Sequence, residues 1–310
     1  EMKAQLSGAI SLNQTELENL NQEYTKYLGH RIYNFIQKHQ ISNLDAVCSH
    51  GHTVFHQPEN GLTLQIGNLP KIADYIQQTV VCDFRIQDVA LGGQGAPLVP
   101  VGDALLFPEY DFCLNLGGFA NISFQNNDQR VAFDICPANI SLNHYIKNLG
   151  FNYDKDGSLA SQGKLSLPLL ESLNYLAFYQ KQPPKSLGLE WLQSEVYPLI
   201  DSFNLDIDSI LRTLVEHTAI QIVKVLNQCN LKHGLYTGGG VLNSFLMARI
   251  AGLLGQNIPI VNLSLIHFKE ALIFAFLGVL KLRNEVNCLR SVTGASKDHS
   301  SGKIYFPHMD

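Results

Sequence analysis

The first 110 residues alternate between helical and strand-like patterns of hydrophobic positions. Apolar residues recur at helical spacing over 17–35, and Asn13 or Thr15 can cap that helix. Short apolar runs typical of strands follow at 44–49, 62–67 and 79–84. The segment 69–78, with Pro70 in its first turn, has the pattern of a helix. This alternation predicts α/β architecture with parallel strands and crossover helices.

The pattern changes after residue 110. Three β-rich runs lie within 112–135, separated by Gly117-Gly118 and by a hairpin signal at 126–128. The pattern then predicts helices at 139–149, 165–181, 189–202, 208–230 and 268–284, with strand-like or apolar segments at 234–239 and 258–262. A three-strand meander followed by alternating helices and strands is one ribonuclease-H-like half of the actin, sugar-kinase and Hsp70 architecture.

We therefore predict an α/β, actin-like ATPase fold of two ribonuclease-H-like lobes that face a cleft. Residues 1–110 are expected to form the first lobe, and 111–310 the second, with a C-terminal segment that can return to the first. The first lobe begins with a helix, so we expect its opening strands to be missing from the printed chain.

Composition and charge narrow the functional classes. The chain has 310 residues, 45% hydrophobic and 16% charged, with a formal net charge of −5, which is ordinary for a globular protein and offers no basic surface for nucleic acid. Six cysteines are dispersed without a Cys-x-x-Cys pair, which favours a reducing compartment. We find neither a signal peptide nor an apolar span of 18 residues, and predict a cytoplasmic protein with no membrane partner.

Two glycine runs are candidate ligand sites. Gly238, Gly239 and Gly240 follow a predicted strand and precede a helix, where backbone can approach an anionic ligand. Gly117 and Gly118 end another strand, close to the neutral polar residue Asn121. Neither run is a P-loop or a dinucleotide fingerprint. The alternative for both is a tight turn without a ligand.

Two acids, Asp83 and Asp88, follow a buried strand and precede the glycine-rich segment 92–97. A nucleophilic hydroxyl needs a carboxylate within hydrogen-bond reach to orient it and accept its proton. The alternatives are a helix cap or a surface ion pair between Asp83 and Arg85.

Other polar residues leave their roles open. His50, His52 and His56 have the spacing of metal ligands, but no acid or cysteine cluster accompanies them, so we expect no protein-held metal and favour a sugar-contacting or structural loop. Asp134 can hold Mg²⁺ through water or a substrate hydroxyl, or cap a helix. Glu270 is either a buried site acid or an exposed charge at a helix start.

Nine segments resemble, in order, the signature segments of the anhydro-N-acetylmuramic acid kinase family. They are SHGHTVFHQPE, TLQIGN, VCDFRIQDVALGGQGAPLVP, LNLGGFANIS, FDICPAN, YDKDGSLASQGK, PPKSLGLEW, TGGGVLN and SVTGA. The resemblance runs from about residue 17 to 296, and the segment 83–100 is its most specific part.

The resemblance implies a reaction. The family hydrolyses the anhydro bridge of 1,6-anhydro-N-acetylmuramic acid while it transfers the ATP γ-phosphate to O6, in peptidoglycan recycling. It implies ATP with Mg²⁺, a homodimer, and an Asp of the Asp-Phe-Arg segment as general base, which we assign to Asp88 with Asp83 as second choice.

The resemblance also implies the binding residues. The first lobe becomes the sugar side, and its substrate-binding residues are expected to be His50, Gly51, Arg85, Gln94, Gly95 and Glu270. The second lobe becomes the nucleotide side. Its ATP-binding residues are expected to be Gly117, Gly118, Asn121, Asp134, Asn139, Gly238, Gly239, Gly240 and Asn243.

The sequence departs from the family pattern in two places. Residues 134–139 read DICPAN where the family often has Asp-Thr-Gly-Pro-Gly-Asn, although Asp134 and Asn139 persist. The family's opening Met-Ser-Gly-Thr-Ser-x-Asp-Gly segment, which handles phosphate, has no match. An alternative function is therefore a catalytically impaired actin-like or Hsp70-like nucleotide-binding protein.

Overall fold

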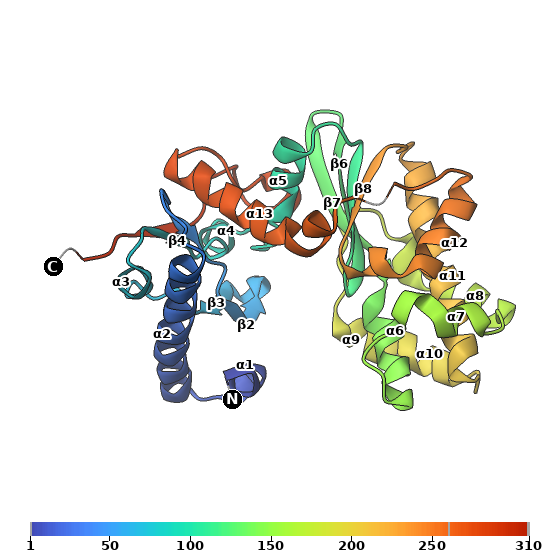
Figure 1. The fold of residues 1–310 in the computed structure, drawn as a ribbon. Helices are drawn as coiled ribbons and strands as arrows, with labels where there is room; N and C mark the ends of the chain where they lie inside the picture. The colour runs from blue at the N-terminus through green and yellow to red at the C-terminus, as the bar shows by residue number, and fades with distance from the viewer. Residues whose placement is uncertain (1, 260, 309–310) are drawn as a thin grey trace. The chain divides into compact units, whose positions relative to one another are not determined.

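The computed structural model describes residues 2–259 and 261–308, which form two compact units (Figure 1). Unit 1 contains the chain up to Gly102 together with the part from Glu270 onward, and unit 2 contains Asp103–Lys269. The chain thus passes between the units at 102/103 and at 269/270. The sequence interpretation placed one boundary at 110/111 and left the return of the C-terminal segment open.

Unit 1 contains a small mixed sheet and a separate hairpin. The sheet has the order β1 (Val47–Cys48), β4 (Val80–Cys82), β9 (Lys303–Tyr305), with β1 parallel and β9 antiparallel to β4. The predicted parallel pairing is confirmed for β1 and β4. It is wrong for β3 (Leu62–Ile66), which pairs antiparallel with β2 (His52–Gln57). Neither β2 nor β9 has an apolar run in its sequence. Both are strands because their backbones pair with neighbouring strands.

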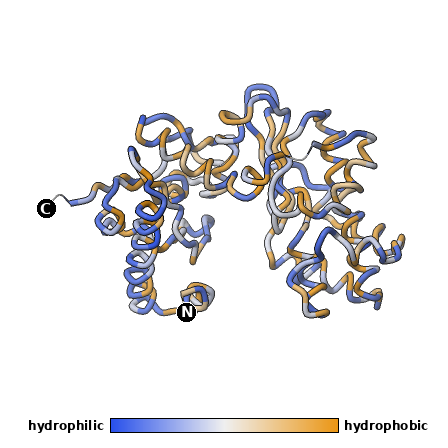
Figure 2. Tube along the Cα trace, in the orientation of Figure 1, coloured by the Kyte–Doolittle hydropathy of each residue, from blue (hydrophilic) through white to orange (hydrophobic). Residues whose placement is uncertain are grey.

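Several helices lie wholly or partly within unit 1. They are α1 (Met2–Gly8), α2 (Gln14–Lys38), α3 (Ile72–Ile76), α4 (Ile86–Ala90), α5 (Val99–Leu106), α13 (Leu263–Leu282) and α14 (Arg290–Thr293), with 3₁₀ turns at Ala9–Ser11 and Pro58–Asn60. The predicted cap of α2 is confirmed, since Asn13 and Glu16 form a reciprocal capping box. Apolar positions recur along this otherwise hydrophilic helix (Figure 2), and Ile36 packs with Ile72 and Ile76.

Unit 2 contains the predicted meander. Its sheet has the order β7 (Gln129–Pro137), β6 (Phe119–Asn126), β5 (Phe112–Leu116), β8 (Gly234–Thr237). The first three strands are antiparallel neighbours, whereas β8 runs parallel to β5. This is the sheet of one ribonuclease-H-like half of an actin-like ATPase fold.

Helices of unit 2 pack against its sheet and against one another. They are α6 (Asn139–Ile146), α7 (Ser158–Gln162), α8 (Leu167–Asn174), α9 (Leu189–Trp191), α10 (Tyr197–Asp201), α11 (Ile207–Gln228) and α12 (Ser244–Leu254). A π-helical turn spans Leu192–Val196, and 3₁₀ turns span Lys147–Leu149, Lys155–Gly157, Ala177–Gln180 and Gly239–Leu242. The predicted helices are thus present, although 165–181 and 189–202 are broken into shorter pieces. In the apolar segment 258–262, the described residues form no strand, and residue 260 lies outside the described residues.

Helix α13 is longer than the sequence interpretation predicts and begins at Leu263. Its 20 residues and mean hydropathy of 1.8 meet the length and composition needed to cross a membrane, a match that the sequence interpretation did not find. Buried core helices of globular proteins have the same properties. Ile273 and Leu277 are fully buried, and Gly278 closely approaches Cys48, so one face of α13 belongs to the core of unit 1.

Candidate active site

Asp83 lies directly after the last residue of β4 and is held on both sides. Its Oδ1 accepts a hydrogen bond from Asn68 Nδ2 at 3.1 Å, and its Oδ2 lies 3.0 Å from Lys303 Nζ. Asp83 has a left-handed backbone with a φ of 57°, which a residue with a side chain adopts at some energetic cost. A small part of the residue (7%) is exposed. The sheet edge therefore presents a fixed, paired carboxylate.

Asp88 is completely buried, with 0% exposure, and both of its carboxylate oxygens are hydrogen-bonded. Oδ2 accepts from the Gly95 backbone N–H at 2.6 Å, and Oδ1 accepts from the Thr293 hydroxyl at 2.7 Å. A Cβ atom on Gly93 would overlap the carboxylate, so the glycine allows the loop to close on it. Asp88 thus fastens the loop that follows α4 to the C-terminal part of unit 1.

Arg85 links several predicted substrate residues. Its Nε donates to His50 Nε2 at 2.8 Å, and its Nη1 donates to the Gly95 carbonyl at 2.7 Å. Since Nε2 of His50 accepts, its Nδ1–H donates to the Gly51 carbonyl at 3.1 Å. Burial, and then the Arg85 charge, lower the pKa of His50, whereas the Glu270 carboxylate acts in the opposite direction. The imidazole is therefore a neutral, oriented group.

The remaining residues of this set occupy supporting positions. The backbone N–H of Gln94 donates to the Thr293 carbonyl at 2.8 Å. Glu270 also favours the charged form of Arg85, whose pKa burial lowers. Unit 1 thus brings together His50, Gly51, Arg85, Gly95 and Glu270. His56, by contrast, lies in the β2–β3 hairpin, where its Nδ1 is 3.1 Å from Thr63 Oγ1.

The two glycine runs of unit 2 lie at one edge of its sheet. Strands β5 and β8 are parallel, with Asn115 opposite Thr237, so both chains leave the sheet at the same edge. A Cβ atom on Gly238, which has a φ of +84°, would lie 2.5 Å from Asn115 Oδ1. A Cβ on Gly240 would lie 2.7 Å from Leu116 Cβ. Only glycine permits this close approach, so the contact at the sheet edge explains part of the glycine run.

Polar side chains surround the glycine runs. Asn139, at the start of α6, donates from Nδ2 to the Leu116 carbonyl at 3.1 Å. Asp134 accepts from the Leu187 backbone N–H at 2.8 Å, and burial raises its pKa. Asn121 lies between Asn115 and Asp134 in register across the sheet.

Asn243 has an identified structural role. Its Oδ1 caps α12 by accepting from the Leu246 backbone N–H at 3.0 Å. Asp134 likewise anchors the loop before α9. The Nδ2 group of Asn243 is a hydrogen-bond donor and Oδ1 of Asp134 is an acceptor, so both can bind a polar ligand.

Sequence reasoning did not identify several residues around the two acids. Asn68 ends the TLQIGN segment, and that position was the available signal. Thr293 lies in the SVTGA segment, which was the available signal for it. Lys303, Cys288 and His299 lie in the C-terminal part, which showed few apolar residues and therefore no packing pattern. Only the fold brings them to Asp83 and Asp88.

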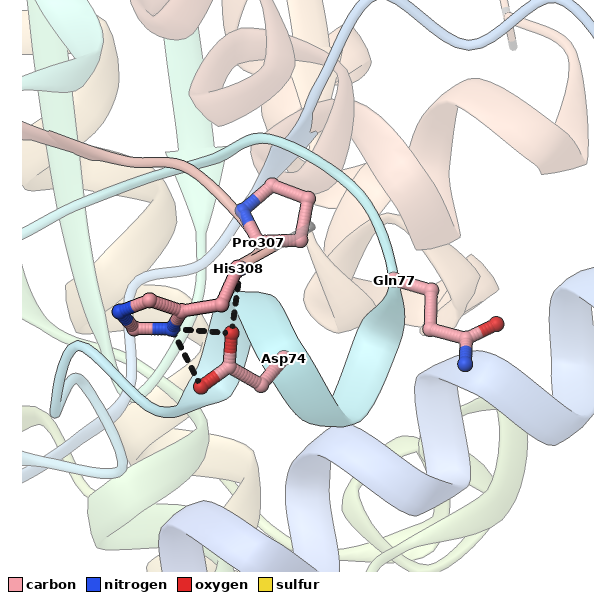
Figure 3. A pocket seen from close by; sticks show the side chains of 4 residues that line it. All are labelled: Asp74, Gln77, Pro307 and His308. Carbon is pink, nitrogen blue, oxygen red and sulfur yellow. Dashed lines mark hydrogen bonds and ion pairs between the residues drawn. The ribbon is translucent and has the colours of Figure 1, made fainter. Parts of the chain in front are cut away.

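A surface pocket of unit 1 is lined by Asp74, Gln77, Pro307 and His308 (Figure 3). The His308 ring Nδ1 lies 2.9 Å from Asp74 Oδ1, and its backbone N–H donates to the same oxygen at 2.8 Å. His308 lowers the pKa of Asp74 through these hydrogen bonds. The pocket contains none of the predicted site residues and is distinct from the candidate active site.

We compared the chain with known proteins and found a matching family. The model of the family described as "Anhydro-N-acetylmuramic acid kinase" matches residues 1–307. The anhydro-N-acetylmuramic acid kinase of Pseudomonas fluorescens is 35% identical, with 98% of this chain and 88% of the relative covered. The Mannheimia succiniciproducens protein of the same name is 36% identical with the same coverage, and the Pasteurella multocida protein is 38% identical, covering 90% and 78%.

These matches define the chain as a kinase, that is, a phosphotransferase, and the sheet of unit 2 agrees with an actin-like ATPase fold. Within that class, the chain belongs to the anhydro-N-acetylmuramic acid kinase family.

Proposed function

We propose that this chain converts 1,6-anhydro-N-acetylmuramic acid, ATP and water into N-acetylmuramic acid 6-phosphate and ADP. Family membership supports the substrates, which belong to cell-wall peptidoglycan recycling. The six free cysteines fit a reaction in the cytoplasm. The observation that carries the mechanism is the fixed carboxylate of Asp83 at the end of β4.

Asp83 is the proposed general base, in preference to Asp88. A base must reach the proton that it accepts, and Asp88 has no exposed surface, whereas 7% of Asp83 is exposed. Asp83 accepts a proton from water as the water oxygen bonds to C1 of the sugar. The C1–O6 bond breaks, O6 takes the γ-phosphoryl group, and the β–γ bridging oxygen leaves with ADP. Lys303 and Asn68 hold the carboxylate in a fixed orientation.

The substrate side of the proposal uses the Arg85 network. Arg85 is fixed by two hydrogen bonds and so presents its remaining N–H groups in a defined direction. His50, Gly51, Gln94, Gly95 and Glu270 complete the expected sugar contacts. The hydrogen bonds from Arg85 to His50 Nε2 and to the Gly95 carbonyl support this role.

The nucleotide side uses the glycine runs of unit 2. Gly117, Gly118 and Asn121 would contact phosphate, while Gly238, Gly239, Gly240 and Asn243 would contact the nucleoside. Asp134 and Asn139 complete the set. Mg²⁺, when bound, would neutralise charge on the transferring phosphates. At Gly118 and Gly239 a Cβ atom would lie 3.6 Å or more from its nearest neighbour, so internal packing does not require these glycines, and they fit a ligand that approaches backbone closely.

The test is ADP release by the purified chain with ATP, Mg²⁺ and the anhydro sugar. We expect release that depends on the sugar. ATP binding without sugar-dependent turnover would support the alternative, a catalytically impaired nucleotide-binding protein. Light scattering of the same preparation tests the expected homodimer.

A further inference from the structure

Three potential metal ligands from distant parts of the chain meet in the core of unit 1. Within the described residues, Asp88, Cys288 and His299 form the group of ligand-type side chains whose donor atoms all lie within 4.8 Å of one another. Asp88 Oδ1 lies 3.0 Å from Cys288 Sγ and 3.6 Å from His299 Nε2. A tetrahedral ion with bonds of about 2.0–2.3 Å separates its ligand atoms by roughly 3.3–3.8 Å. The donor atoms are therefore close to this spacing.

The backbone holds the three ligands in place. Cys288 and His299 face each other in an antiparallel β-bridge, with reciprocal hydrogen bonds of 3.1 Å. Asp88 is held by the Gly95 N–H and the Thr293 hydroxyl. Preformed ligand positions of this kind reduce the entropy lost when an ion binds.

His299 presents an unpartnered nitrogen to this group. Its Nδ1 lies 3.1 Å from the Lys297 carbonyl and donates its proton there. Nε2, the nitrogen that carries the lone pair when the ring is neutral, is buried and has no hydrogen-bond partner. A backbone carbonyl that fixes the second ring nitrogen is the usual support of a metal-bound histidine.

Charge also favours an ion at this position. The Asp88 carboxylate is completely buried, and its hydrogen-bond donors are a backbone N–H, a hydroxyl and a thiol. A buried carboxylate without a cation is costly. A divalent ion with one carboxylate, one thiolate and one neutral imidazole makes a group of zero net charge.

From this geometry we infer that Asp88, Cys288 and His299 bind one Zn²⁺ ion. Mixed thiolate, imidazole and carboxylate ligation suits Zn²⁺, whereas Mg²⁺ and Ca²⁺ prefer oxygen ligands. Binding replaces the Cys288 thiol proton, which leaves to solvent, with a Zn–S bond. The fourth position is filled by water or by the Thr293 hydroxyl. This site departs from the sequence expectation of no protein-held metal.

The ion would be structural. It would hold in place the segments that pack beside the proposed base, Asp83. It ties the loop carrying Gly95, which fixes Arg85, to the segment 287–301. Ser301 of that segment donates to the Phe84 carbonyl, next to Asp83, at 2.6 Å. The inference does not depend on the identity of the sugar substrate.

The test measures metal directly on the full chain. Protein treated with a chelator is checked for folding by circular dichroism, and then titrated with Zn²⁺ and, separately, with Co²⁺. We expect about one ion per chain, with about one proton released per ion. Cobalt bound to a thiolate should give a near-ultraviolet charge-transfer band. Zinc should also raise the unfolding temperature.

Variants identify the ligands. Cys288→Ser and His299→Gln should abolish the cobalt–thiolate band, whereas Cys229→Ser, at an exposed cysteine, and His308→Gln, at an exposed histidine, should retain it. If Cys288→Ser or His299→Gln fails to fold, X-ray absorption of the wild-type cobalt protein tests the same point. One sulfur ligand on the cobalt would support the inference, and none would contradict it. A folded wild-type chain that binds less than about 0.1 ion at excess metal would overturn the inference, as would a band that survives in Cys288→Ser.

Discussion

Two carboxylates only five positions apart occupy opposite environments in unit 1. Asp83 ends a strand, has a left-handed backbone, and pairs with a lysine whose side chain is half exposed. Asp88 lies in the helix α4 and is sealed from solvent by a glycine loop, a threonine and a cysteine. Asp83 keeps a small exposed part and a half-exposed partner, whereas Asp88 has no exposed surface and links the loop after α4 to the C-terminal part of unit 1.

This difference shows that closeness to a glycine-rich loop does not make an acid catalytic. The glycines at 92–95 let the loop close over the Asp88 carboxylate. The sequence interpretation preferred Asp88 because it adjoins that loop. From the geometry we propose the reverse order. Three changes test it, and a fourth tests the Arg85 network beside it.

Asp83→Asn should lower kcat by about 10²- to 10⁴-fold, because the amide cannot accept the proton of water. ATP affinity should stay near that of the wild type. Steady-state ADP release and nucleotide titration measure the two effects. Asp45→Asn, an exposed carboxylate change in the same unit, is the matched control. If Asp88→Asn reduces kcat more than Asp83→Asn in folded protein, the comparison fails.

Asp88→Asn should lower the free energy of unfolding by about 1–3 kcal/mol, because an amide group cannot accept from both the Gly95 N–H and the Thr293 hydroxyl. Urea unfolding measures the change. Asp83→Asn should have a smaller effect on unfolding, since a small part of Asp83 remains exposed. Equal stability losses in the two variants would contradict the assignment of separate roles.

Lys303→Met should lower kcat/KM by about tenfold, or about 1.4 kcal/mol, because Asp83 loses its cationic neighbour. The hydrogen bond to Asp83 raises the pKa of Lys303, so the lysine is charged at neutral pH. Lys26→Met, on the exposed face of α2, provides the control. An unchanged kcat/KM would show that the ion pair between Lys303 and Asp83 does not contribute to catalysis.

His50→Gln should make the loss of stability at acidic pH less steep. Burial lowers the pKa of His50, so below about pH 6.5 the unfolded chain takes up a proton that the folded chain resists. Stability that is fully present above pH 6.5 is therefore lost as the pH falls. Thermal unfolding from pH 7.5 to 5 measures the slope. An identical slope in the variant would exclude His50 as a contributor.

Local patterns were sufficient for much of the fold. The helix α2 and its Asn13 cap, the meander β5–β7 and the long helix α11 were predicted because each carries its own periodicity and turn residues. The antiparallel strands β2 and β9 were not predicted, since backbone pairing across the fold creates them. The return of the chain into unit 1 at Glu270 left no local signal either.

For the candidate site, too, the sequence showed some features and only the fold showed the others. The residue types and the glycine runs could be found in the chain, because carboxylates and glycines have chemistry of their own. Whether an acid is exposed or sealed depends on which distant segments surround it. Thr293, Cys288 and His299 reach Asp88 from 200 or more positions away in the sequence, and Lys303 reaches Asp83 through β9. Sequence pattern thus determined the candidates, and tertiary packing decided their environments, because burial and hydrogen bonding are properties of neighbours in space.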